Sequence, residues 1–85
     1  MTYNYPTNRS VRIEYSLPKT SSVDISVFNV MGQWVADLSR GEQPAGHHTV
    51  LWNGADSFGR PVPRGTYIFR MRANGYEQIN TIAMK

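Results

Sequence analysis

Apolar residues recur at every second position in several short runs, and this period of two is the feature that most restricts how the chain can fold. The alternation is clearest in Val11–Leu17, Val23–Val27 and Tyr67–Met71. Successive side chains of a β-strand point to opposite faces, so each run predicts a strand with one buried and one solvated face. The sequence shows no stretch with the roughly 3.6-residue apolar spacing of an amphipathic helix. We therefore expect an all-β fold.

Turn-forming residues divide the chain into short strands. Asn74–Gly75 is the strongest local signal, because both residues tolerate the positive φ angles that a type I′ turn requires. It predicts a tight hairpin into a last strand at Tyr76–Met84. Gly32 is predicted to adopt a positive φ in a second tight turn, within Asn29–Gln33. The other expected elements are strands at 34–38 and 48–52 and loops rich in Gly and Pro at 39–46 and 53–65.

The number and spacing of these elements indicate the fold class. Turn signals about every 8–12 residues, separating about seven short strands, are typical of a sandwich or a barrel. The inward positions carry large side chains of mixed size, which suit two sheets about 10 Å apart better than a closed barrel. We predict an immunoglobulin- or fibronectin-III-like antiparallel β-sandwich of about seven strands. The 85 residues form one domain, placed at 9–85 after a linker remnant or loose N-terminal segment at 1–8.

The composition excludes several classes of protein. The chain has no cysteine, which rules out disulfides, zinc-thiolate sites and thiol catalysis. No apolar stretch approaches the roughly 20 residues of a spanning helix, so no membrane insertion is expected. The net charge of +3 is spread along the chain rather than gathered in one stripe, so no nucleic-acid partner is expected. Arg12, Arg70 and Arg72 would converge only under certain strand orders, and ordinary solvated positions are the favoured alternative.

Residues able to perform catalysis are few and scattered. His47 and His48 are neighbours on an expected strand, so their side chains point to opposite faces and cannot jointly bind a metal. The six acidic residues fall on separate strands and turns, and no spacing pairs two of them as general acid and base. The sequence lacks the common nucleophile, zinc and phosphate-loop motifs. We expect no enzyme, no cofactor, and no catalytic or metal-binding residue.

The loop at 53–65 raises the alternative of a calcium site. Asn53, Asp56 and Ser57 offer the oxygen atoms that calcium prefers, but their spacing differs from that of a calcium loop. The favoured interpretation is that Asp56 and Ser57 start turns by bonding to nearby backbone.

Four aromatic residues raise the alternative of a platform for sugars. Burial in the core, or a covering position over one open end of the sandwich, is favoured. The residues concerned are Trp34, Trp52, Phe58 and Tyr76.

Three stretches carry a resemblance to a known family. Residues 23–35, V-D-I-S-V-F-N-V-M-G-Q-W-V, resemble the strand and following turn of immunoglobulin-like domains related to the flagellar hook-capping protein FlgD. Residues 43–71 are similar to that family's pattern P-A-G-x-H-x-x-x-W-x-G-x-D-x-x-G-x-x-V-x-x-G-x-Y. Residues 5–18, Y-P-T-N-R-S-V-R-I-E-Y-S-L-P, resemble the start of such domains in secreted Bacteroidetes-type proteins, without the usual second proline.

This resemblance implies a seven-stranded sandwich that acts as the C-terminal sorting and anchoring signal of a larger exported protein. Its partner would be a type IX secretion machinery or another protein at the outer membrane. Its location would be the cell surface or the outside of a Gram-negative-type bacterium. The alternatives are a structural or adhesive module, such as a hook-cap-like assembly domain or a surface-protein spacer, and a carbohydrate-binding accessory module. The family's characteristic positions are interpreted as fold-defining, namely Gly32, Trp52, Gly54, Asp56, Gly59, Gly65 and Tyr67.

The last expected strand is the predicted partner contact. An unpaired strand edge can add to the sheet of another protein, and the end of the chain would present such an edge. The partner-binding candidates are Gln78, Asn80, Ile82, Met84 and Lys85.

Overall fold

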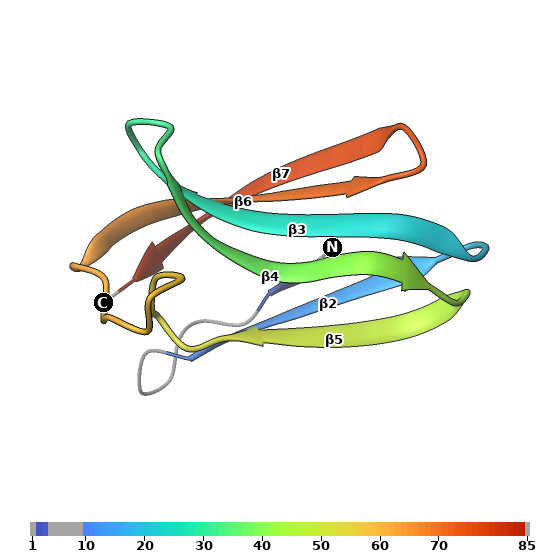
Figure 1. Cartoon of the computed structure of the whole chain (residues 1–85), viewed down its shortest axis with the longest axis horizontal. Helices are drawn as coiled ribbons and strands as arrows, with labels where there is room; N and C mark the ends of the chain where they lie inside the picture. The colour runs from blue at the N-terminus through green and yellow to red at the C-terminus, as the bar shows by residue number, and fades with distance from the viewer. Residues whose placement is uncertain (1, 4–9, 85) are drawn as a thin grey trace.

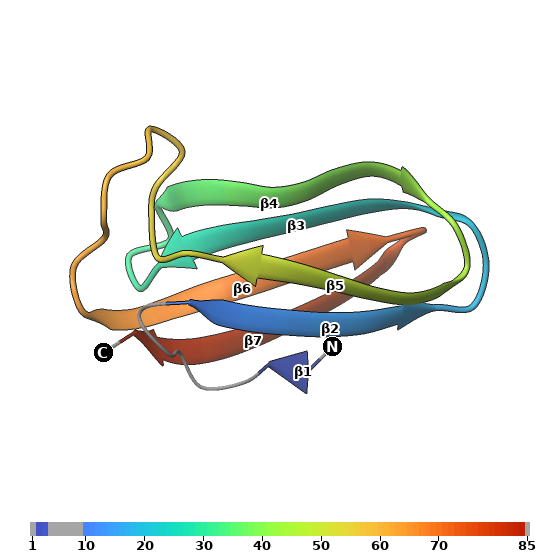
Figure 2. The same ribbon diagram turned by 90° about the horizontal axis from the view of Figure 1, so that it is seen from below.

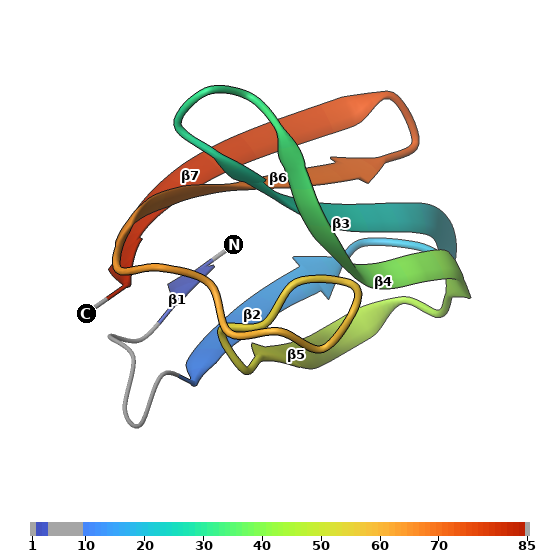
Figure 3. The same ribbon diagram turned by 60° about the vertical axis from the view of Figure 1, so that its left-hand side comes forward.

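Two antiparallel sheets pack face to face in the computed structural model, which describes residues 2–3 and 10–84 (Figure 1). The strands are β1 (Thr2–Tyr3), β2 (Val11–Leu17), β3 (Ser21–Asn29), β4 (Trp34–Gln43), β5 (Gly46–Trp52), β6 (Gly65–Ala73) and β7 (Tyr76–Met84). One sheet has the strand order β1-β2-β5 and the other the order β4-β3-β6-β7. Figure 2 views the molecule with β2 and β5 in front, and Figure 3 shows the two layers apart. The predicted immunoglobulin-like antiparallel β-sandwich is confirmed.

The N-terminal segment predicted at 1–8 lies mostly outside the described residues. Thr2–Tyr3 forms β1, whose backbone pairs with Ile13 and Glu14 of β2. The proposed domain boundary at residue 9 therefore stays a prediction.

The space between the sheets is filled by the alternate residues that the period of two predicts. In β2 and β6 the inward side chains are buried, and their neighbours lie on the outer faces. Trp52, at the end of β5, is only 1% exposed and meets Tyr67 and Phe69 edge-on, with ring centroids 5.3 and 5.5 Å away. Its indole N–H donates to the carbonyl of Ala55 at 2.9 Å, so its polar atom is satisfied. A second buried cluster, which includes Tyr15, occupies the other half of the interior.

The two predicted tight turns are present. Asn74 and Gly75 have φ angles of 50° and 79° and leave Ala73 paired with Tyr76, which is a two-residue hairpin. Gly32 has a φ of 79°, and its N–H donates to the carbonyl of Asn29 at 3.0 Å. Both predictions are confirmed.

Strand β4 corrects the prediction of a loop at 39–46. The strand continues to Gln43, because every residue of this stretch up to Gln43 finds a partner along β3. Gly41, at φ 123°, lies inside the strand and faces Val23. The pairing stays in register on both sides of Gly41, so this glycine does not end the strand. The polar composition of the stretch reflects exposure at the sheet edge rather than a loop.

Candidate functional site

Two bulges in β4 build the outer face of the four-stranded sheet. Leu38 and Val35 are the extra residues, since the register with β3 shifts past each of them. As a result Trp34, Asp37 and Arg40, three residues apart, all take outward positions opposite β3. A regular strand with a period of two would have sent Asp37 inward. The bulges therefore add the Asp37 carboxylate to the surface that carries the Trp34 indole and the Arg40 guanidinium.

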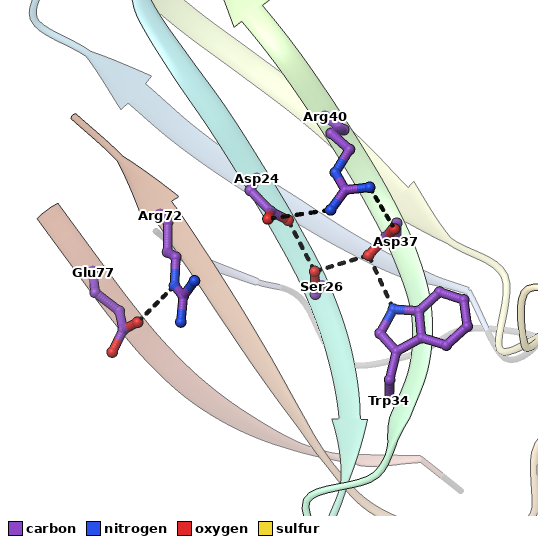
Figure 4. A network of polar contacts seen from close by, with 7 residues as sticks. All are labelled: Asp24, Ser26, Trp34, Asp37, Arg40, Arg72 and Glu77. Atoms are coloured by element: carbon purple, nitrogen blue, oxygen red, sulfur yellow. Dashed lines mark hydrogen bonds and ion pairs between the residues drawn. The ribbon is translucent and has the colours of Figure 1, made fainter. Parts of the chain in front are cut away.

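Charges alternate along one row across this face. The residues paired across β4, β3, β6 and β7 are, in order, Arg40, Asp24, Arg72 and Glu77. The Arg40 guanidinium lies 4.0 Å from Asp24 and 3.7 Å from Asp37, and Arg72 Nε lies 3.0 Å from Glu77 Oε2 (Figure 4). Opposite charges on facing positions of neighbouring strands stabilise the sheet modestly. We call these four residues the charged row.

Ser26 links two carboxylates at the centre of the network. Its hydroxyl, buried on the outer face at 3% exposure, lies 2.9 Å from both Asp24 Oδ1 and Asp37 Oδ1 (Figure 4). A hydroxyl has one proton, so it donates to one carboxylate at a time. Trp34 Nε1 donates to the same Asp37 oxygen at 3.0 Å.

These contacts lower the pKa of Asp37. The hydrogen bond from Trp34 is the largest cause, and the bond from Ser26 and the charge of Arg40 act in the same direction against a partial desolvation effect. Donors to a carboxylate favour its ionised form. Asp37 is thus held as a carboxylate.

An apolar row lies on the same face, separated from the charged row by one row made of Asp37, Ser26, Arg70 and Ile79. Trp34 of β4 faces Phe28 of β3, which faces Ile68 of β6, and Thr81 of β7 completes the row. The Arg70 guanidinium lies over the Phe28 ring, 4.6 Å from its centroid, in a cation–π contact. The outer face therefore combines an aromatic strip with alternating charges.

A second surface lies at the end of the sandwich where β3 turns into β4 and where β5 leads to β6 (Figure 1). The backbone N–H of Ser57 donates to the carbonyl of Val35 at 3.1 Å and ties the two segments together. Trp34 and Phe58 line a hollow of about 310 Å³ between them. Phe58 is 78% exposed, and the Arg60 guanidinium lies 5.2 Å from its ring centroid.

Asp56 organises the loop of this second surface. Its Oδ1 accepts hydrogen bonds from the N–H groups of Phe58 and Arg60 at 2.9 and 3.0 Å, and its Oδ2 lies 3.2 Å from Arg60 Nε. The N–H of Arg60 is the largest cause of the lowered pKa of Asp56. Asn53 accepts a bond from the N–H of Ala55. Asn53 Oδ1 and Asp56 Oδ1 thus accept from the loop's own backbone, which for Asp56 agrees with the favoured turn-forming role.

The four aromatic residues considered for a sugar platform do not come together. Trp52 is buried in the core, and Tyr76 follows the hairpin at the opposite end of the sandwich (Figure 1). Trp34 and Phe58 share the hollow at the β3–β4 end. The alternation of β5 had indicated the inward position of Trp52, whereas the pairing of Trp34 with Phe58 depends on loop geometry that no pattern specifies.

The three arginines do not converge either. Arg12 lies on the outer face of the three-stranded sheet and pairs with Glu14 at 3.0 Å. Arg70 and Arg72 lie on the outer face of the other sheet, since they alternate with buried residues of β6. The two groups are therefore separated by the whole core.

The two histidines make separate contacts on β5, as their adjacent positions predict. His47 Nδ1 lies 3.0 Å from the hydroxyl of Ser16. His48 Nε2 donates to the carbonyl of Pro44 at 2.7 Å, and its ring stacks on Tyr15. Across residues 2–3 and 10–84, no three His, Cys, Asp or Glu side chains gather into a group that would hold a metal ion.

The partner-binding candidates of β7 fall on its inward face. Ile82 and Met84 belong to the core, with 3% and 1% exposure, so their side chains are inaccessible to a partner. Gln78 and Asn80 are half-buried on the same side, and Asn80 Nδ2 is buried without a hydrogen-bond partner in the described structure. Lys85 lies outside the described residues. β7 is the last strand of its sheet, so a backbone contact along its edge stays a prediction.

The residues interpreted as fold-defining lie in the turns and the core. Tyr67 is buried, and its hydroxyl donates at 2.7 Å to the carbonyl of Pro63, four residues upstream and just before β6. This contact has the form of the tyrosine corner of Greek-key sandwiches. The loop glycines all have positive φ angles, 75° at Gly54, 81° at Gly59 and 148° at Gly65. The contribution of each residue to folding remains a prediction.

The described residues define an immunoglobulin-like sandwich with an ordered polar outer face and an apolar loop end, and they contain no helix long and apolar enough to cross a membrane. The family of FlgD Ig-like domains matches the chain over residues 5–76, and the chain belongs to that family.

Among solved structures, FlgD from P. aeruginosa is similar, with a TM-score of 0.68 and 30% sequence identity. The match covers 88% of this chain but 60% of the FlgD chain, so the present chain corresponds to little more than half of that protein. A comparison with curated proteins found no match.

Proposed function

We propose that the chain is a non-catalytic assembly module, comparable to the immunoglobulin-like part of a flagellar hook cap. The observation that carries this proposal is the match to FlgD from P. aeruginosa at 30% identity over 88% of the chain, together with the family match over residues 5–76. A relationship of this kind supports an analogous structural role, which is to hold neighbouring protein subunits in place.

The chemistry of the surface supports a non-catalytic role. General acid–base catalysis needs a group whose pKa lies near the working pH. The two carboxylates with shifted values, Asp37 and Asp56, are shifted downward by hydrogen bonds and are fixed as anions. Both sit in exposed networks where their donors come from the same sheet or loop. Such groups organise a surface rather than transfer protons.

The exposed apolar residues supply what an assembly module needs for packing against protein neighbours. Val30, Met31 and Phe58 are each more than half exposed at the β3–β4 end of the sandwich. Val30 and Met31 lie in the β3–β4 turn and Phe58 in the β5–β6 loop, and exposed apolar groups at one end of a domain are candidates for contact with another protein. The rigid sandwich would present this end at a fixed angle to the next subunit.

A domain exchange tests the proposal. The immunoglobulin-like part of P. aeruginosa FlgD is replaced by residues 5–85, and hook formation is counted by electron microscopy against wild-type FlgD and against FlgD lacking the domain. We expect cells with the chimera to form many more hooks than cells with FlgD that lacks the domain. A matched chimera carrying Phe58→Ser and Met31→Ser should fold but assemble fewer hooks. A folded, exported chimera that performs no better than the deletion would refute the assembly role.

A type IX sorting signal is the second candidate, favoured by the resemblance of residues 5–18 to the opening of such domains. In this case the chain would be continuous with a larger cargo, reach the cell surface or medium, and contact the secretion machinery. A reporter fused ahead of residues 5–85 in a type IX-competent cell separates the two functions. Export of the reporter would favour sorting, and retention in the periplasm would favour assembly.

A further inference from the structure

We propose that a second copy of this chain packs face to face on the outer surface of the four-stranded sheet, through a two-fold axis that runs parallel to the strands between β3 and β6. The inference goes beyond the assembly role, because it concerns contact between identical chains. It rests on the order of charges across the sheet, which is complementary to itself.

The charged row determines which two-fold axis brings opposite charges together. From edge to edge its signs are plus, minus, plus and minus, at Arg40, Asp24, Arg72 and Glu77. A two-fold axis along the strands reverses the row, so the first position of one copy faces the last of the other. Arg40 would then face Glu77 of the second copy, and Asp24 would face Arg72. A two-fold axis along the row would instead place like charges together, which selects the first arrangement.

The apolar row fits the same axis. Reversal brings Phe28 of one copy against Ile68 of the other, and Trp34 against Thr81. Phe28 and Ile68 are half-buried and Trp34 is 50% exposed, so each still has apolar surface to cover. One axis therefore matches charges in the charged row and apolar groups in the apolar row, while in the row between them it places Ser26 against Arg70 and Asp37 against Ile79. The three-stranded sheet lacks this property, since its outer face offers the Arg12–Glu14 pair along a single strand.

The size of the face predicts a weak association. Four strands about 4.8 Å apart and four rows about 7 Å apart give roughly 500 Å² per copy, or about 1,000 Å² in total. That area lies at the lower end for specific complexes, where transient contacts are found. Charges that are half-exposed before association also make the contact sensitive to salt. We expect a dissociation constant on the order of 100 μM at low ionic strength, weakened several-fold by 0.5 M salt.

A charge exchange between two variants tests the geometry. In Asp24→Lys the introduced lysine faces Arg72 of the second copy, and in Arg72→Glu the introduced glutamate faces Asp24. Each variant alone therefore brings like charges together and should dimerise about ten-fold more weakly than the wild type. When the two variants are mixed, the introduced lysine of one chain meets the introduced glutamate of the other, and the remaining Arg72 meets the remaining Asp24. Association in this heterodimer should return to near the wild-type level.

Sedimentation equilibrium at low salt measures each variant and the mixture. Rescue by mixing requires contact between chains, because a merely structural effect inside each variant would persist in the mixture.

Two controls make the outcome decisive. Glu14→Lys reverses a carboxylate on the three-stranded sheet, 46% exposed against 30% for Asp24, and should leave dimerisation unchanged. If Asp24→Lys or Arg72→Glu loses the β-sheet circular dichroism of the wild type, the pair Arg40→Glu and Glu77→Lys repeats the exchange at the ends of the row. The proposal is wrong if the wild type stays a single species of 9.7 kDa at 1 mM, if mixing restores nothing, or if Glu14→Lys weakens association equally.

Discussion

The interior of the sandwich and the outer face of its four-stranded sheet are built from the same strands but follow different rules. Along β6, Phe69 and Met71 point into the core, while Arg70 and Arg72 between them point out. The inner set is fixed by the volume it must fill between the sheets. The outer set is fixed by register, because the pairing of β6 with β3 and β7 places Arg72 between Asp24 and Glu77, and two bulges in β4 turn Asp37 to the same face. The inner set should therefore control stability, and the outer set should control association.

Substitution of Trp52 is the most direct way to break this comparison. Trp52→Ala removes the largest fully buried side chain and leaves a cavity beside Tyr67 and Phe69. We expect a loss of about 3–5 kcal/mol in the free energy of unfolding, measured by urea denaturation. Leu51→Ala, at the outward neighbour in β5, should cost less than about 1 kcal/mol. Equal losses of unfolding free energy at the two positions would contradict the burial of Trp52 between the sheets.

The hydroxyl of Tyr67 separates the packing of the core from its hydrogen bonding. Tyr67→Phe keeps the ring against Trp52 and removes the bond to the carbonyl of Pro63. We expect a loss of about 1 kcal/mol, because a part-buried carbonyl loses its partner. Tyr76→Phe is the matched control on an exposed ring and should change stability by less than about 0.5 kcal/mol. If Tyr67→Phe and Tyr76→Phe unfold at the same temperature, the hydrogen bond from Tyr67 to Pro63 contributes nothing to stability.

The contrast between the two regions also explains what could be predicted from sequence. The period of two and the turn residues were sufficient for the sandwich, for burial of Trp52 and for the hairpin at Asn74–Gly75, because each follows from local backbone geometry. The continuation of β4 to Gln43 was missed, since its polar composition resembles a loop. The outer network was missed for a different reason. A bulge reverses the parity of every residue beyond it, and nothing in the local sequence marks Val35 or Leu38 as the extra residue.

Acid titration tests whether the network holds Asp37 as an anion. The pKa of Asp37 is lower in the folded protein, so its stabilising contribution is present above the unfolded value of about 4 and is lost as the pH falls through the folded value. Asp37→Asn should lower stability by less than about 1 kcal/mol at pH 7, because the site is largely exposed. The difference in the free energy of unfolding between Asp37→Asn and the wild type, measured by urea denaturation, should shrink below pH 4. The exposed Glu42→Gln on the same strand is the control, and a difference that grows on acidification would contradict the lowered pKa.

The smallest expected effect gives the sharpest comparison between the two outer faces. The ion pairs Arg12–Glu14 and Arg72–Glu77 both have a nitrogen-to-oxygen distance of 3.0 Å. Their side chains are equally exposed, 53% and 46% in the first pair and 54% and 46% in the second. Their surroundings differ, because Arg72 also faces Asp24 across the sheet. A double-mutant cycle to Ala on each pair, measured on dilute monomer, should give about 0.2–0.5 kcal/mol for both. Truncating Asp24 to Ala as well should raise the coupling of Arg72 with Glu77 and leave that of Arg12 with Glu14 unchanged, because the Asp24 charge lies opposite Arg72 across the sheet. If removal of Asp24 leaves both couplings the same, the charged row is a set of independent pairs, and only its contact with a second copy would give the alternation a role.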